Sequence, residues 1–332
     1  MSPPFYAASV CYRPLKQLLR ATRASQLVFS SQNVTNRSLI CCRACSEEAR
    51  PSKRPPRFYV PEKALQFSQP GATFQLGTEE THHALKVLRL REGAALEVCD
   101  GSGTIAAAFL KGIGSNHKAF VETSQPPKMY PWQGPKWELV AACFSLKGGR
   151  ADFLVEKAAE LGAYSLRPIL TVRSPYLGRR PVIIEVVSVS DDSEEEQEDV
   201  ETPDIKRRNR WRRVAQAATK QSLRSTTMAI RVPVHVKELA DHVRKASLAL
   251  VGVEGAPAIM DVLEQQADAL AGMQRPGAKP GLLLVGPEGD FTPDELQALI
   301  DAGAKPVGLG PNRLRVETAA LAMLTAVTLR TW

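Results

Sequence analysis

From Trp137 to its end, the chain alternates short apolar runs with stretches of helical periodicity. Strands are predicted at 139–144, 166–170, 281–285 and 306–309, and each precedes a predicted helix, at 151–161, 210–223, 293–302 and 318–329. Strands and helices that alternate in this way form a parallel sheet with helices on both faces. Ligands of such sheets bind at the carboxyl ends of the strands. The strand-to-helix turns of this region therefore indicate where a functional site would lie.

The residues before this region follow a different pattern, because their short apolar runs alternate with turns. Strands are predicted at 95–99, 104–110 and 119–122. This spacing predicts a small β domain over 57–130, ahead of the α/β domain over 135–332. Residues 81–90 predict a helix with one apolar side and one basic side.

Two segments outside both domains carry opposite charge biases. Residues 1–46 contain six Lys and Arg and no carboxylate, whereas residues 181–205 contain ten carboxylates and no Lys or Arg. The net charge of +8 therefore leaves 8 − 6 + 10 = +12 for the rest of the chain. This excess fits a polyanionic partner such as RNA, and a merely soluble basic surface explains it equally well.

Residues 1–56 are predicted to be a transit peptide and linker, because they are rich in Arg and Ser and lack the apolar core of a secretory signal. Residues 40–46 resemble a plastid processing site, so the chloroplast is the expected compartment, with the mitochondrion as the alternative. A tail that stays attached is the other interpretation. The acidic stretch at about 181–206 is predicted to be a disordered, solvated insertion, with mimicry of RNA as the alternative.

Two further site classes are not expected. No uninterrupted apolar run is long enough to cross a bilayer, so the sequence does not predict a membrane role. Cys42 and Cys45 have a C-x-x-C spacing, but no second Cys or His pair follows at zinc-finger distance. The sequence therefore predicts no metal site.

Two strand-to-helix junctions near the carboxyl terminus are marked by glycines. In the first, Gly286 and Gly289 permit close backbone approach to a ligand, and Thr292 opens a helix as its N-cap. In the second, Gly310 precedes a loop, and Glu317 lies where a helix amino terminus favours a carboxylate. Neither junction contains a P-loop or a dinucleotide-binding fingerprint.

The two junctions, GPEGDFTPDE at 286–295 and LGPNRLRVETAA at 309–320, resemble the carboxy-terminal signatures of the ribosomal RNA small subunit methyltransferase E family. The resemblance extends upstream to HHALKVLRLREGAALEVCDGSG at 82–103, KGGRADFLVEKAAELG at 147–162 and RWRRVAQAATKQSLR at 210–224. It covers about 57–332, without the acidic insertion.

This resemblance implies a SPOUT α/β domain with a deep carboxy-terminal trefoil knot, preceded by a small PUA-like β-barrel domain that helps to bind RNA. It implies a homodimer that uses S-adenosylmethionine to methylate uridine N3 in small-subunit ribosomal RNA, free or in the assembled subunit, during ribosome biogenesis. General topology rules disfavour knots, so the knot rests on the resemblance alone.

By position, the resemblance assigns ten residues to the cofactor: Leu284, Gly286, Glu288, Gly289, Leu309, Gly310, Leu314, Arg315, Thr318 and Ala319. Asp290 departs from the family pattern, in which glycine is expected in many relatives. The catalytic candidates are Arg315, Glu288 and Glu317. Either carboxylate could be the general base, although Glu317 is equally suited to cap a helix and Glu288 to order its loop. Arg315 could stabilise a deprotonated uracil, hold a phosphate or form a structural salt bridge.

Eight basic residues are predicted to contact RNA: His82, His83, Arg89, Lys147, Arg150, Arg173, Lys220 and Arg224. Lys220 and Arg224 are four residues apart and would share one helix face. For each residue taken alone, a solvated surface position is the alternative. Two other functions remain open. One is a SPOUT methyltransferase that modifies ribose 2′-O or transfer RNA, and the other is a non-catalytic RNA-binding assembly factor.

Overall fold

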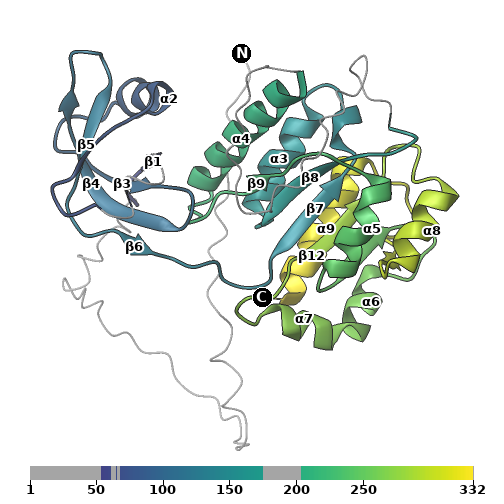
Figure 1. The fold of residues 1–332 in the computed structure, drawn as a ribbon. Helices are drawn as coiled ribbons and strands as arrows, with labels where there is room; N and C mark the ends of the chain where they lie inside the picture. The colour runs from purple at the N-terminus through teal and green to yellow at the C-terminus, as the bar shows by residue number, and fades with distance from the viewer. Residues whose placement is uncertain (1–53, 61–64, 66–67, 175–202, 332) are drawn as a thin grey trace, which may run out of the picture. The chain divides into compact units, whose positions relative to one another are not determined.

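The computed structural model describes residues 54–60, 65, 68–174 and 203–331. The predicted transit peptide, apart from 54–56, and nearly all of the predicted acidic insertion lie outside these residues. The described residues belong to one unit, Arg54–Trp332, which contains two β-sheets. Figure 1 shows both sheets and the helices that pack on them.

The first sheet is mostly antiparallel and has the order β1-β3-β4-β5-β2, with β6 also paired to β4. Its strands are β1 (Arg57–Tyr59), β2 (Thr73–Gln75), β3 (Ala95–Cys99), β4 (Thr104–Ile113), β5 (Ala119–Thr123) and β6 (Lys128–Met129). Only the β1–β3 pair is parallel among these described strands. The predicted β-rich character of this region is confirmed.

The core of the first sheet is built from alternating apolar side chains. Phe58, Leu96 and Val121 are buried in it, because every second residue of a strand faces the same side. Against this core lie α2 (Thr78–His82) and the π-helix η1 (His83–Val87). The single helix predicted at 81–90 is therefore two shorter elements, and the second has the wider π geometry.

The second sheet is parallel throughout and has the order β10-β8-β7-β12-β11-β13, with β9 also paired to β8. Its strands are β7 (Trp137–Ala141), β8 (Ser165–Leu170), β9 (Ala229–Ile230), β10 (Val234–His235), β11 (Ala249–Gly252), β12 (Gly281–Val285) and β13 (Lys305–Val307). The α/β class predicted from the alternation of elements is confirmed.

Helices cover both faces of this sheet (Figure 1). One face carries α3 (Arg150–Glu160), α4 (Pro203–Gln221), α6 (Ile259–Gln265), α7 (Ala267–Met273) and α9 (Val316–Thr331). The other carries α5 (Val236–Lys245) and α8 (Pro293–Asp301). Neighbouring strand residues serve opposite faces, since Leu283 packs in the first layer and Leu284 in the second. A short 3-10 helix, η2 (Cys143–Ser145), follows β7.

The central strands also contain one buried ion pair. The Arg167 Nε atom lies 2.6 Å from the Glu138 Oε1 atom, and both side chains are about nine-tenths buried. Ser165 donates a hydrogen bond of 2.9 Å to the other Glu138 oxygen. These contacts satisfy both oxygens of a carboxylate that would otherwise be costly to bury.

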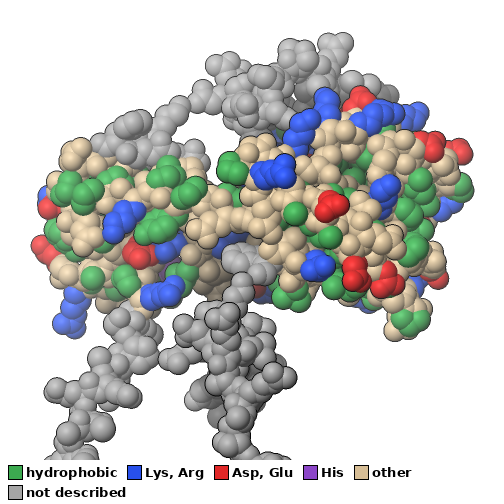
Figure 2. Space-filling model, turned by 90° about the horizontal axis from the view of Figure 1, so that it is seen from below, with side chains coloured by type: hydrophobic (Ala, Val, Ile, Leu, Met, Phe, Trp, Pro, Cys, Tyr) green, Lys and Arg blue, Asp and Glu red, His purple; other side chains and the backbone are tan. Residues whose placement is uncertain are grey.

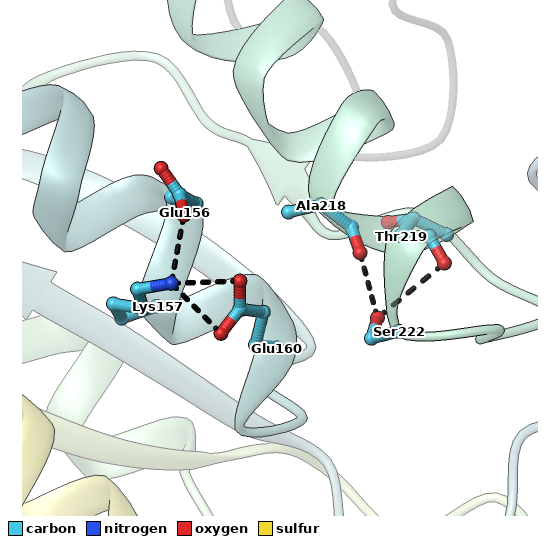
Figure 3. Close-up of polar contacts among 6 residues, drawn as sticks. All are labelled: Glu156, Lys157, Glu160, Ala218, Thr219 and Ser222. Carbon is cyan, nitrogen blue, oxygen red and sulfur yellow. Dashed lines mark hydrogen bonds and ion pairs between the residues drawn. The ribbon is translucent and has the colours of Figure 1, made fainter. Parts of the chain in front are cut away.

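Figure 3 shows the carboxyl-terminal ends of α3 and α4. On α3, Lys157 is held between Glu156 and Glu160, and these contacts raise its pKa, with the Glu156 hydrogen bond as the largest cause. At the end of α4, the Ser222 hydroxyl donates to the Ala218 carbonyl oxygen at 2.7 Å and satisfies a carbonyl group of the last turn. The partly exposed end of α3 therefore carries a net negative charge.

Several elements between 225 and 280 were not predicted from the sequence, namely β9, β10, β11, α5, α6 and α7. Among the described residues, no helix is both long and apolar enough to span a membrane. The threading of the chain into a knot stays a prediction of the resemblance.

Candidate functional site

A cavity lies where β12, β11 and β13 end, and these three strands are neighbours in the parallel sheet. The ends of these strands, the loops that follow them and the start of α9 supply its lining. The lining residues are Gly252, Val253, Glu254, Val285, Gly286, Pro287, Glu288, Asp290, Val307, Leu309, Gly310, Asn312, Arg313, Leu314, Val316 and Ala319. The cavity therefore lies at the edge where parallel sheets bind ligands.

The loop after β12 is held in place by the start of α8. Thr292 accepts a hydrogen bond from the Glu295 backbone N–H, and the Glu295 side chain accepts one from the Thr292 backbone N–H, so the predicted N-cap is confirmed and forms part of a capping box. The Phe291 ring packs 3.1 Å from the point where a Gly286 Cβ would lie. A side chain at Gly286 would thus require Phe291 to shift by a few tenths of an ångström.

Asp290, the departure from the family pattern, has a left-handed backbone conformation with φ of 63°. This conformation explains why glycine is expected there, because side chains with a Cβ atom are disfavoured at positive φ. Asp and Asn tolerate it best among the other residues, since their side chains bond the local backbone. Here the Asp290 carboxylate accepts a hydrogen bond of 2.8 Å from the Phe291 backbone N–H. The substitution therefore keeps the loop and adds a carboxylate to the cavity.

The loop after β13 is fixed by backbone contacts with the segment before α6. The Gly308 backbone N–H donates to the Pro257 carbonyl oxygen at 2.7 Å, and the Gly308 carbonyl oxygen accepts from Ile259 at 3.0 Å. A Cβ atom on Gly308 would lie 2.3 Å from the Ala256 carbonyl oxygen, which is far inside contact distance. Two residues later, Gly310 has a φ of 110° with open space beside its Cα atom. Glycine is therefore required at both positions for different reasons.

The third loop, after β11, was not among the predicted site segments. Gly252, Val253 and Glu254 line the cavity. The signal was present, because the apolar run 248–251 precedes Gly252 and Gly255 in the same arrangement as the two recognised junctions.

Charged lining residues make the cavity negative. Glu254, Glu288 and Asp290 contribute three carboxylates and Arg313 one guanidinium, which gives −3 + 1 = −2. Around them, Val285, Leu309 and other apolar side chains form the walls. Such a site suits a ligand that combines a flat apolar part with positive charge.

Arg150 joins the two predicted catalytic carboxylates. Its guanidinium lies 3.2 Å from the Glu288 Oε1 atom and 3.6 Å from the Glu317 Oε2 atom. Ser145 also donates to Glu288, at 3.4 Å. The Glu317 carboxylate is buried, and its Oε2 atom has no hydrogen-bond partner among the described residues. Arg150 therefore compensates a buried charge while it holds Glu288 at the cavity.

Two other arginines brace the backbone of the first loop. Arg313 donates a hydrogen bond of 2.6 Å to the Glu288 carbonyl oxygen, and Arg173 donates one of 2.8 Å to the Gly289 carbonyl oxygen. Both contacts are to backbone atoms, so they fix the path of the loop and leave the Glu288 side chain to Arg150 and Ser145.

The structure brings six of the ten predicted cofactor residues to the cavity: Gly286, Glu288, Leu309, Gly310, Leu314 and Ala319. The other four are not among the lining residues. Leu284 is buried in the core below, Gly289 packs against Arg173, and Arg315 and Thr318 are exposed. Of the catalytic candidates, only Glu288 lines the cavity.

The prediction that Lys220 and Arg224 share a helix face is wrong. Helix α4 ends at Gln221, so the two residues do not share a helix face. Lys220 forms a largely buried ion pair with Glu80. Arg224 donates to the Ala159 and Ala163 carbonyl oxygens, and burial lowers its pKa to about 10. Both cations are therefore engaged in structural contacts: Lys220 joins α4 to α2 beside the first sheet, whereas Arg224 bonds within the α/β layer.

The other six predicted RNA residues are distributed over two regions. His82, His83 and Arg89 are exposed at α2 and η1, and Lys147 is exposed just before α3. Arg150 and Arg173 are engaged with the cavity loop, as described above. Figure 2 shows one face of the molecule, on which cationic and anionic side chains are interspersed and apolar ones lie in separate small groups.

Comparison with known proteins matches both regions of the chain. The model of an RNA methyltransferase domain matches residues 186–328, and that of an RNA methyltransferase PUA domain matches residues 76–123. The ribosomal RNA small subunit methyltransferase E of Bacillus subtilis is 24% identical over 279 residues, 83% of this chain and 96% of the relative. These findings show that the chain is similar to RNA methyltransferases that carry a PUA domain, and that this relative is a small subunit methyltransferase E.

Further proteins of that family extend the agreement. The ribosomal RNA small subunit methyltransferase E of Mycobacterium bovis is 29% identical over 77% of this chain and 86% of its own length. A crystal structure of the family enzyme from Neisseria gonorrhoeae, bound to S-adenosyl methionine, has a TM-score of 0.61 at 25% identity and covers 83% of this chain and 98% of that one. A methyltransferase from Legionella pneumophila shares the fold, with a TM-score of 0.63. The predicted order of a PUA-like domain followed by a SPOUT-type α/β domain is confirmed.

Proposed function

We propose that the chain transfers a methyl group from S-adenosylmethionine to N3 of a uridine in small-subunit ribosomal RNA, as a step in ribosome biogenesis. One observation carries this proposal: three glycine-marked loops at the ends of adjacent parallel strands line the same negative cavity. The names of the relatives supply the RNA class, and the Neisseria structure supplies the cofactor.

The cavity residues fit this cofactor by their chemistry. Val285, Leu309 and Val316 would hold the apolar faces of an adenine ring, and the carboxylates of Glu254 and Asp290 would offset the positive charge of the sulfonium and ammonium groups. When bound, S-adenosylmethionine supplies an activated methyl group. The protein then has to hold the acceptor nitrogen in line and keep competing water away.

Glu288 is the candidate that fits the role of general base. The N3 proton of uracil has to leave before or during methyl transfer, and Glu288 is the one predicted catalytic carboxylate on the cavity wall. Arg150 and Ser145 orient its two oxygens. Glu317 instead serves as the buried counter-charge of Arg150. Arg315 is exposed beside the second loop, where it would contact the RNA.

We further propose that the enzyme acts as a homodimer in the chloroplast, with the mitochondrion as the alternative. The family resemblance supports the dimer, and Leu329 on α9, with 72% exposure, leaves apolar surface for a second copy. The Arg-rich, acid-poor composition of residues 1–46 supports organelle import. The partner of the enzyme would be small-subunit ribosomal RNA, either free or within the assembled subunit.

The test is methyl transfer from labelled S-adenosylmethionine to unmodified small subunits, followed by mass spectrometry of the nucleosides. Labelled 3-methyluridine is the expected product. A labelled ribose or a different base would overturn the N3 specificity. Cofactor binding without transfer to free RNA or to subunits would favour an RNA-binding assembly factor.

A Glu288→Gln variant gives the matched control, because it keeps the size of the side chain and its hydrogen bonds with Ser145. We expect it to bind the cofactor and to lose most of its turnover. Full turnover in this variant would exclude Glu288 as the base.

A further inference from the structure

Helix α4 contains a concentration of cations, and of these only Lys220 was among the predicted RNA contacts. Between residues 205 and 221 it has seven Lys and Arg and no carboxylate. Trp211, Ala215 and Ala218 turn toward the core, because they recur at helical spacing. Arg210 and Arg213, three residues apart, therefore lie together on the opposite, exposed face.

The two arginines remain open to solvent despite their ion pairs. Their side chains are 65% and 64% exposed, and Arg210 pairs with Asp152 whereas Arg213 lies 4.0 Å from Glu79. Ion pairs at such exposure contribute little to stability, since water screens both charges. Phosphate groups could replace these partners with little loss to the fold.

The position of this face links the first sheet to the cavity. Glu79 belongs to α2, next to the exposed His82 and His83, so the Arg213 end of the face adjoins the PUA-like domain. Asp152 belongs to the first turn of α3, and Arg150 in the same turn contacts Glu288 on the cavity wall. A strand of RNA on this face would therefore run from the PUA-like domain toward the reaction site.

The charge distribution along the neighbouring helix favours the same path. At the start of α3, Lys147 is exposed and adds a further cation. At its other end, Glu156 and Glu160 hold Lys157 between them and leave a net negative charge (Figure 3). A polyanion would be attracted to the first end and repelled from the second.

We propose that the exposed face of α4 formed by Arg210 and Arg213 is an RNA docking surface that receives backbone phosphates of the substrate. The proposal rests on the proposed function, since it assumes an RNA substrate. Contacts of this kind position the RNA and carry no sequence preference. The two arginines would thus determine the affinity for RNA and the position of the RNA on the protein. The cavity loops and the acceptor base would determine the methyl transfer.

The experiment compares the full chain with an Arg210→Gln/Arg213→Gln double variant in binding to unmodified small-subunit ribosomal RNA. Each lost phosphate contact lowers the salt slope of the affinity by roughly 0.7–0.9. When the salt concentration is raised from 50 to 200 mM, the loss of RNA affinity should therefore be about tenfold smaller in the double variant than in the wild type. Cofactor affinity and thermal stability should stay unchanged.

Arg244→Gln is the matched control. Arg244 is 59% exposed and pairs with an aspartate in the same manner, but it lies on α5, which covers the opposite face of the sheet. We expect its RNA affinity and salt slope to equal those of the wild type. An unchanged slope in the double variant, or an equal loss in Arg244→Gln, would overturn the docking surface. A wild-type chain that binds no RNA would instead overturn the proposed function.

Discussion

Gly308 is the residue whose replacement should damage the cavity most for the smallest chemical change. A methyl group at this position would lie 2.3 Å from the Ala256 carbonyl oxygen, which is a backbone atom and cannot rotate away. Gly308→Ala must therefore separate the loop after β13 from the segment 256–259. That movement would break the hydrogen bonds that Gly308 makes with Pro257 and Ile259.

The cost follows from these contacts. Two hydrogen bonds contribute about 1 kcal/mol each, and a methyl group forced into a packed site costs about 1–3 kcal/mol. The free energy of unfolding should thus fall by about 3–5 kcal/mol, which lowers the midpoint of thermal unfolding by on the order of 10 °C. Since Leu309 and Gly310 line the cavity directly after this residue, cofactor affinity should fall as well.

The assay is thermal unfolding combined with calorimetric titration of S-adenosylmethionine. Gly272→Ala is the control, because Gly272 lies in α7 without a positive φ, and a Cβ atom added there would meet nothing within 4 Å. Alanine in a helix is favoured over glycine by about 0.5–1 kcal/mol, so this variant should unfold at the same or a slightly higher temperature. If Gly308→Ala behaves like Gly272→Ala in both measurements, the argument from backbone overlap is wrong.

Three more predictions concern buried polar groups. Glu138→Gln should leave the Arg167 charge uncompensated and lower the free energy of unfolding by about 3–5 kcal/mol, and an unchanged urea midpoint would contradict this. Burial acts to raise the pKa of Asp100, but hydrogen bonds donated by Ser102 and Thr104 hold this pKa below its ordinary value of 3.8. Its stabilisation is therefore present above that pH and lost below it, so Asp100→Asn should flatten the stability curve between roughly pH 5 and pH 3 in urea titrations. Burial raises the pKa of the Cys143 thiol to about 12, so peptide mapping after alkylation at neutral pH should find it unmodified in the folded protein, and rapid labelling would disprove this.

Local signals predicted the elements next to the site well. The strand at 281–285 and the N-cap at Thr292 depend on residues close together in the sequence, and the structure has both. Asp290 stood out as a departure, and its left-handed backbone supplies the physical reason. The loop after β11 was missed although its apolar run and glycines follow the same pattern.

The burial of side chains and their pairing with residues distant in the sequence could not be predicted from local patterns. Lys220 and Arg224 have the composition of an RNA-binding helix, yet their partners Glu80 and Ala159 are 140 and 65 residues away in the sequence. Nothing in the local pattern distinguishes them from Arg210, which remains exposed on the same helix as Lys220. The ion pair between Arg150 and Glu317 was hidden for the same reason, because it joins α3 to α9.

The loops after β11, β12 and β13 are proposed to form the cofactor site, and every step of the proposed reaction depends on this assignment. Amide hydrogen exchange, measured by mass spectrometry with and without S-adenosylmethionine, tests it most directly. We predict that the cofactor slows exchange in peptides that cover 252–255, 286–291 and 308–315, and leaves α5 and the first sheet unchanged. Protection confined to other segments, or no protection at saturating cofactor, would contradict the assignment.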